Sequence, residues 1–89
     1  MKLPLNFAII KYITTVKEAC ADDVMEALKK DYSGYSMFNK KAIYETLFTA
    51  EMNGFVKEVR YELANDGDLK VYYHSPPEGK AIVDMYIPG

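Results

Sequence analysis

The chain has 89 residues, enough for a single small domain with one core and no second lobe to close over a substrate, which argues against most enzymes. Apolar residues make up 49% of the chain and the net charge is −2, a composition typical of a folded protein rather than a disordered one. The isoelectric point is near 5.3. Binding to nucleic acid would therefore have to come from a local basic patch.

Three segments have the 3.6-residue apolar period of amphipathic helices. They predict helices over about 5–16, 20–31 and 39–53. Asn39 is a suitable N-cap for the third of them. The third helix should end at Asn53 and Gly54, a pair typical of a helix C-terminus that also turns the chain.

The apolar period then changes from 3.6 to 2, which predicts two strands over about 55–63 and 69–74. Between them, Asn-Asp-Gly at 65–67 offers the positive-φ residues of a hairpin turn, so the strands should be antiparallel neighbours. A last helix is predicted over about 77–86, with Ser75 as its cap. The fold class is therefore expected to be α+β.

The order helix, helix, helix, hairpin, helix is that of a winged helix-turn-helix. Three helices would form the core, the two-stranded β-hairpin would form the wing, and a short C-terminal helix would follow. We expect one winged-helix domain over residues 1–89.

Two stretches of the chain have a recognisable residue pattern. The first comprises Tyr44, Leu47, Ala50, Gly54, Phe55 and Val56, and the second comprises Tyr72, Tyr73, Pro77, Glu78, Gly79 and the basic Lys80. The first resembles the recognition helix of PadR-like transcriptional regulators, and the second resembles the passage in that family from the second wing strand into the last helix. The resemblance implies a sequence-specific DNA-binding transcriptional regulator, a repressor that acts as a homodimer. Family members continue into a long C-terminal helix, whereas this chain stops at Gly89.

In a winged helix, the N-terminal residues of the third helix enter the major groove of double-stranded DNA. Asparagine can pair with adenine, and lysine can donate to guanine or to a phosphate. The wing could add phosphate contacts. The candidate DNA-binding residues are Asn39, Lys40, Lys41, Glu45, Thr49, Arg60 and Lys70. The alternative is that Asn39 only caps its helix and the two lysines form a solvated face.

The first and last helices carry more apolar residues than a three-helix core would hide. We expect a homodimer interface there, with the candidate residues Phe7, Ile10, Ile82, Val83 and Tyr86. The alternative is that these side chains complete the core of the monomer.

A second hypothesis for the function is a winged-helix protein-interaction module without DNA binding. The acidic isoelectric point, Glu45, and the acidic wing tip at Asp66 and Asp68 favour it. So do four tyrosines that the core does not explain, Tyr32, Tyr35, Tyr72 and Tyr86. Charge placement separates the two hypotheses. DNA binding predicts that Lys40, Lys41, Arg60 and Lys70 share one face, and protein binding predicts that Glu45, Glu58 and Glu62 interrupt them.

The sequence gives little sign of catalysis, of a metal or of another cofactor. His74 is the single histidine and Cys20 the single cysteine, and no glycine-rich phosphate loop is present. Cys20 could be a redox-sensitive thiol at a helix start or a small buried filler. No signal peptide or apolar run of about 18 residues is apparent, so we expect a cytoplasmic protein without membrane contact. An effector ligand is not indicated.

Overall fold

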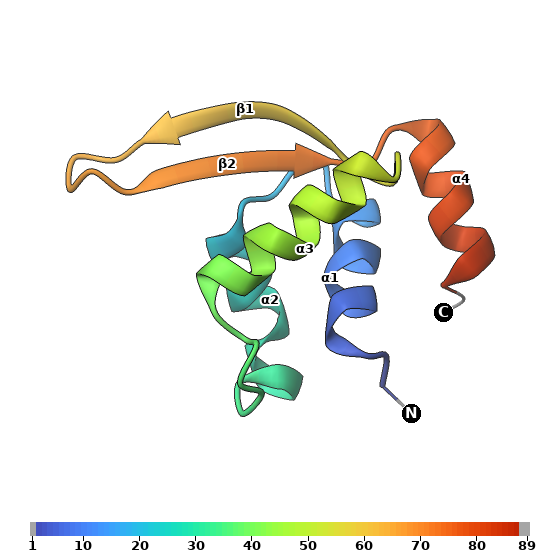
Figure 1. The fold of residues 1–89 in the computed structure, drawn as a ribbon, viewed down its shortest axis with the longest axis horizontal. Helices are drawn as coiled ribbons and strands as arrows, with labels where there is room; N and C mark the ends of the chain where they lie inside the picture. Colours follow the sequence, from blue (N-terminus) through green and yellow to red (C-terminus); the bar gives the residue numbers. More distant parts are fainter. Residues whose placement is uncertain (1, 88–89) are drawn as a thin grey trace.

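Three helices, a β-hairpin and a fourth helix follow one another in the computed structural model, which describes residues 2–87 (Figure 1). The elements are α1 (Leu5–Thr14), α2 (Ala21–Tyr32), α3 (Lys40–Met52), β1 (Lys57–Leu63), β2 (Leu69–His74) and α4 (Pro77–Tyr86). This arrangement confirms the predicted α+β winged-helix fold.

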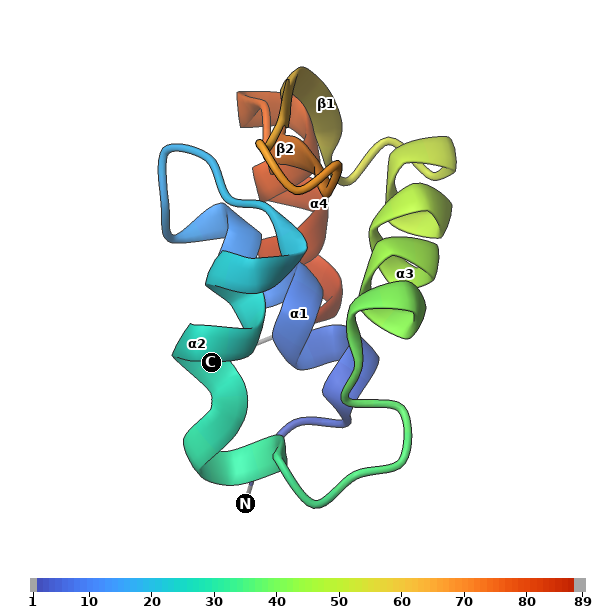
Figure 2. The ribbon, with the colours of Figure 1, turned by 90° about the vertical axis from the view of Figure 1, so that its left-hand side faces the viewer.

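Helix α1 lies at the centre of the molecule and packs against α2, α3 and α4 (Figure 2). The core forms where their apolar sides meet. Ile13, Val24, Ile43 and Leu47 are fully buried there, and Val83 of α4 is 1% exposed. Each belongs to the apolar stripe of its helix, so burial of these stripes holds the bundle together.

Two boundaries differ from the prediction by two residues, and those of α2 and α3 by one. Helix α1 ends at Thr14 rather than near residue 16, because the hydroxyls of Thr14 and Thr15 donate back to the carbonyls of Lys11 and Tyr12 at 2.6 and 2.7 Å. Strand β1 begins at Lys57 rather than near residue 55. The chain first turns out of α3.

The turn that follows α3 contacts the start of α4. Gly54 has a φ of +81°, as a helix-terminating glycine does, and the Phe55 N–H donates to the Ala50 carbonyl at 3.0 Å. The predicted cap of α4 is wrong, because the Ser75 hydroxyl donates to the Phe55 carbonyl at 2.8 Å and Pro76 is the capping residue. A Cβ on Gly79 would lie 2.5 Å from the Phe55 oxygen, so only glycine allows this close approach.

The hairpin has two chemically different faces. Tyr61 pairs with Val71 and Leu63 with Leu69 on one face, and Glu62 pairs with Lys70 on the other. Gly67, with a φ of +88°, is the one residue of the turn at positive φ, so the expectation for Asn65 and Asp66 is wrong.

The base of the hairpin is attached to the chain between α1 and α2. Ala19 and Tyr73 exchange two backbone hydrogen bonds of 2.9 Å, which form an isolated antiparallel bridge beside β2. The hairpin thus stands between this connection and α3 (Figure 2).

Candidate interaction surface on α3 and the hairpin

The start of α3 is fixed by Asn39. Its Oδ1 accepts a hydrogen bond from the Ala42 N–H at 2.9 Å, and its Nδ2 donates to the Ser36 carbonyl at 3.1 Å. The side chain therefore caps the helix, as the alternative interpretation required. A contact of Asn39 with a base would compete with both of these bonds.

Lys40 and Lys70 come together, but around carboxylates. The Lys40 ammonium lies 2.5 Å from Asp68 and 3.6 Å from Asp22, and the Lys70 ammonium lies 3.6 Å from the same Asp22 oxygen. The hydrogen bond to Asp68 raises the pKa of Lys40, with the charge of Asp22 adding to the effect. The two lysines are therefore already paired within the chain.

Arg60 is paired as well. Its guanidinium lies 2.5 Å from Glu18 and 2.6 Å from Glu62, and it stacks 3.8 Å above the centre of the Tyr72 ring. The hydrogen bonds to Glu18 and Glu62 raise the pKa of Arg60. The hydrogen bond between Arg60 and Glu62 also lowers the pKa of Glu62. The arginine is held toward the connection between α1 and α2.

These pairs give this side of the molecule no positive excess. We call it the charged face, and it comprises Glu18, Asp22, Lys40, Arg60, Glu62, Asp68 and Lys70. Its three cations meet four carboxylates, which gives a net charge of −1. Of the three glutamates predicted to interrupt the basic residues, Glu62 does so by pairing with Arg60. Glu18, Asp22 and Asp68 do so as well, although the prediction did not include them.

Lys41, Glu45 and Thr49 lie on exposed parts of α3. Lys41 and Glu45 line a groove of about 400 Å³ between α3 and β2. Within residues 2–87, neither takes part in an ion pair. Thr49 lines a different groove, between α3 and α1, which Glu45 lines as well. The candidate DNA-binding side chains other than Asn39 therefore divide into two groups, Lys40, Arg60 and Lys70 on the charged face and Lys41, Glu45 and Thr49 along the exposed side of α3.

The rest of the groove between α3 and β2 is apolar. Tyr44, Phe48, Val71 and Tyr73 line it. The Tyr44 hydroxyl accepts a hydrogen bond from the Val71 N–H at 3.1 Å and so fastens the hairpin to α3. Burial raises the pKa of Tyr73 to about 12.

Exposed apolar side chains continue from this groove along both elements. On α3, Phe48 and Met52 are 59% and 71% exposed, and they follow Tyr44 at helical spacing. On the hairpin, the exposed side chains share the face of Val71. We call the whole surface the apolar face, and it comprises Tyr44, Phe48, Met52, Tyr61, Leu63, Leu69 and Val71.

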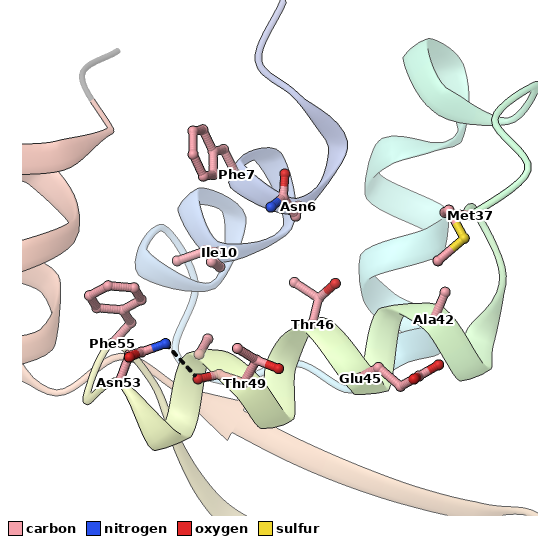
Figure 3. Close-up of a pocket in the computed structure, with 11 residues that line it drawn as sticks. Asn6, Phe7, Ile10, Met37, Ala42, Glu45, Thr46, Thr49, Asn53 and Phe55 are labelled. Carbon is pink, nitrogen blue, oxygen red and sulfur yellow. Dashed lines mark hydrogen bonds between the residues drawn. The ribbon is translucent and has the colours of Figure 1, made fainter.

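A second groove lies on the other side of α3, against α1 (Figure 3). Its volume is about 380 Å³. Phe7 and Ile10 line it from α1, and Thr46 and Thr49 line it from α3. Apart from Glu45, the α3 side chains that line this groove are small, which leaves the space between the two helices open.

The candidate dimer residues divide into two groups. Ile10 and Val83 are 7% and 1% exposed and belong to the monomer core. Phe7 and Tyr86 are 41% and 71% exposed, and Ile82 is half-buried. The dimer interface on α1 and α4 remains a prediction, with less surface than the sequence indicated.

The four tyrosines attributed to a partner surface also divide into covered and exposed ones. Tyr32 is 3% exposed and its hydroxyl donates to the Leu3 carbonyl, so this residue belongs to the monomer core. Tyr72 is covered by Arg60. Tyr35 and Tyr86 are exposed.

Cys20 is 1% exposed, and burial raises the pKa of its thiol. This contradicts the idea of a thiol made reactive by a lowered pKa and favours the buried filler. Within residues 2–87, no cluster of three or more His, Cys, Asp or Glu side chains could hold a metal ion. None of the helices described is long and apolar enough to cross a membrane.

The fold is shared with a solved structure from Thermoplasma acidophilum, described as a "putative transcriptional regulator TA0346". The TM-score is 0.69 at 17% identity, over 93% of this chain and 76% of that one. No family model and no curated protein matches the chain. The winged-helix fold is thus supported independently, and membership of the PadR-like regulators stays a prediction.

Sequence reasoning missed the apolar face. The spacing of Tyr44, Phe48 and Met52 marks a second apolar side of α3, in addition to the buried side of Ile43 and Leu47. It also missed the carboxylates of Glu18 and Asp22, which lie far along the chain from Arg60 and Lys70. The signal for the apolar face was the alternation of side chains in the hairpin, because it makes one face of the hairpin apolar.

Proposed function

We propose that the protein is a winged-helix regulator that acts by docking onto another protein through its apolar face. The observation that carries the proposal is the exposure of Phe48, Met52, Tyr61 and Leu63, each at least 59%, where a winged helix would face DNA. Exposed apolar patches of this kind are typical of protein interaction sites.

The electrostatics support the same conclusion. DNA binding depends on cations that replace the counterions of the phosphates. Here Lys40, Arg60 and Lys70 already neutralise carboxylates, and the acidic Asp68 lies at the wing tip. A phosphate backbone on the charged face would meet four carboxylates for three cations.

DNA binding is the second candidate function, as expected from the PadR-like resemblance. The capped start of α3 and the exposed Lys41 favour it, since helix N-termini attract phosphate. Exposed ion pairs are worth only about 0–1 kcal/mol, so Lys40 could exchange Asp68 for a phosphate. In this case the protein would be a sequence-specific repressor.

Fluorescence anisotropy with mixed-sequence duplex DNA across a salt series separates the candidates. We expect no binding at about 50 mM salt, whereas a DNA reader should bind non-specifically with a Kd of roughly 10⁻⁴ to 10⁻⁶ M. Binding that weakens steeply with salt, and that is lost in Lys40→Ala/Lys41→Ala, would overturn the proposal in favour of DNA.

Site-specific photo-crosslinking tests the docking directly. Benzoylphenylalanine is placed at position 48, in the apolar face, and in a control chain at the exposed position 80 on α4. Cells of the source organism are irradiated. We expect a defined protein adduct from position 48 and none from position 80. Equal adducts from both positions, or none from position 48, would contradict docking through the apolar face.

A further inference from the structure

We infer that the partner that covers the apolar face is a second copy of this chain. The inference rests on the proposed function, because it names the occupant of the same surface. It differs from the dimer predicted from the sequence, which used α1 and α4.

The size of the apolar face suits such a contact. Its five most exposed residues are Phe48, Met52, Tyr61, Leu63 and Leu69, between 49% and 71% exposed. At roughly 200 Å² for each large side chain when fully exposed, they offer on the order of 600 Å². A stable interface buries about 800 Å² per partner, so the apolar face with a polar rim is sufficient.

The two charged residues that line the groove between α3 and β2 make this surface self-complementary. Lys41 and Glu45 lie one helical turn apart beside Phe48, and neither has an ion pair within residues 2–87. Lysine before glutamate is the weaker order for an ion pair within one helix. In a two-fold interface each residue of the patch meets the same patch, so Lys41 of one copy can pair with Glu45 of the other.

The unpartnered hairpin gives a further reason. A two-stranded hairpin is marginally stable alone and needs its apolar face covered. Its basic side chains, Arg60 and Lys70, are already paired within the chain with Glu18 and Asp22. Its apolar face is covered by α3 only near Tyr44 and Val71, where the two elements are hydrogen-bonded. A second copy would cover the remainder, toward Leu63 and Leu69.

The test is the oligomeric state of the purified full chain, measured by sedimentation equilibrium. We expect a dimer for the native sequence. Phe48→Asp should weaken dimerisation by about thirtyfold or more, since it removes a central apolar anchor. The control Tyr86→Asp changes an aromatic residue on α4 that is 71% exposed, against 59% for Phe48, and should leave dimerisation unchanged.

A charge exchange sharpens the assignment. Lys41→Glu should weaken the dimer by about tenfold, because two carboxylates would then face each other. The double variant Lys41→Glu/Glu45→Lys should restore it, since the pair is reversed and not lost. A monomer at all concentrations, or a dimer weakened by Tyr86→Asp alone, would overturn the inference.

The photo-crosslink at position 48 distinguishes this failure from failure of the proposed function. An adduct with twice the mass of the chain supports the second copy. An adduct with a different protein contradicts the second copy and leaves docking intact. Absence of any adduct, together with salt-dependent DNA binding, contradicts both.

Discussion

The two sides of α3 are similarly apolar and differ in what covers them. Ile43 and Leu47 point inward and are fully buried, while Phe48 and Met52 point outward and are more than half exposed. On the inner side, the free energy of apolar burial is already used in folding. On the outer side it is still available. The helix therefore offers a partner the same kind of contact that it makes with its own core.

Leu47 and Phe48, neighbours in sequence, should show the largest contrast. We expect Leu47→Ala to lower the free energy of unfolding by about 2–5 kcal/mol, because it opens a cavity in the core. Phe48→Ala should change it by about 0.5 kcal/mol or less. Urea denaturation followed by circular dichroism, at concentrations where the chain is monomeric, measures both. Similar losses for the two variants would show that the outer side is covered within the monomer.

Asn39 sets where α3 begins and so fixes which residues face inward. Asn39→Ala should lower the free energy of unfolding by about 1 kcal/mol, since the Ala42 N–H loses its partner. Asn39→Asp keeps an accepting oxygen and is the matched control. Thermal denaturation of the two variants gives the difference. If Asp were as destabilising as Ala, the cap would not be the cause.

Tyr44 joins the outer side of α3 to the hairpin. Tyr44→Phe should cost about 0.5–1.5 kcal/mol, because the Val71 N–H loses its acceptor. Hydrogen exchange of the Val71 amide should become faster. Tyr61→Phe serves as the control, since the Tyr61 ring is 68% exposed and its hydroxyl makes no hydrogen bond within residues 2–87. An unchanged exchange rate of the Val71 amide would show that its hydrogen bond to Tyr44 does not hold the hairpin on α3.

The charged face should show the smallest effect, visible mainly with pH. Arg60 lowers the pKa of Glu62 in the folded chain. The stabilisation from this pair is therefore present above the ordinary carboxyl pKa and is lost as the pH falls through the lowered value. In Arg60→Gln, NMR titration should give Glu62 a higher pKa than in the native chain. An unchanged pKa would show that the pair does not persist in solution.

The fold was predictable because its determinants are local. The apolar period placed Ile13 and Leu47 in the core, and alternation with Gly67 indicated the hairpin. The candidate site was less predictable. Arg60 meets Glu18 across 42 positions of sequence, and Lys40 meets Asp68 across 28. Such pairs depend on how the elements pack, which a period does not reveal.

The apolar face escaped prediction for a different reason. Tyr44, Leu47 and Phe48 make α3 apolar on two sides, and a helical period alone does not say which side the bundle covers. The packing of α1 and α2 against α3 decides this by burying Ile43 and Leu47. The hairpin joins α3 at Tyr44 and leaves Phe48 in the open groove.

The two ends of the hairpin are attached by different kinds of contact. The backbone hydrogen bonds between Ala19 and Tyr73 clamp its base, and near its tip the Lys40 ammonium ties Asp68 to α3. The clamp consists of backbone hydrogen bonds, which salt hardly affects, whereas the tie is a partly exposed ion pair that salt screens. We therefore expect rising ionic strength to weaken the tie at the tip before the base. The hydrogen bond from the Val71 N–H to the Tyr44 hydroxyl is screened little by salt and keeps the middle of the hairpin on α3, so the freedom gained is confined to the tip.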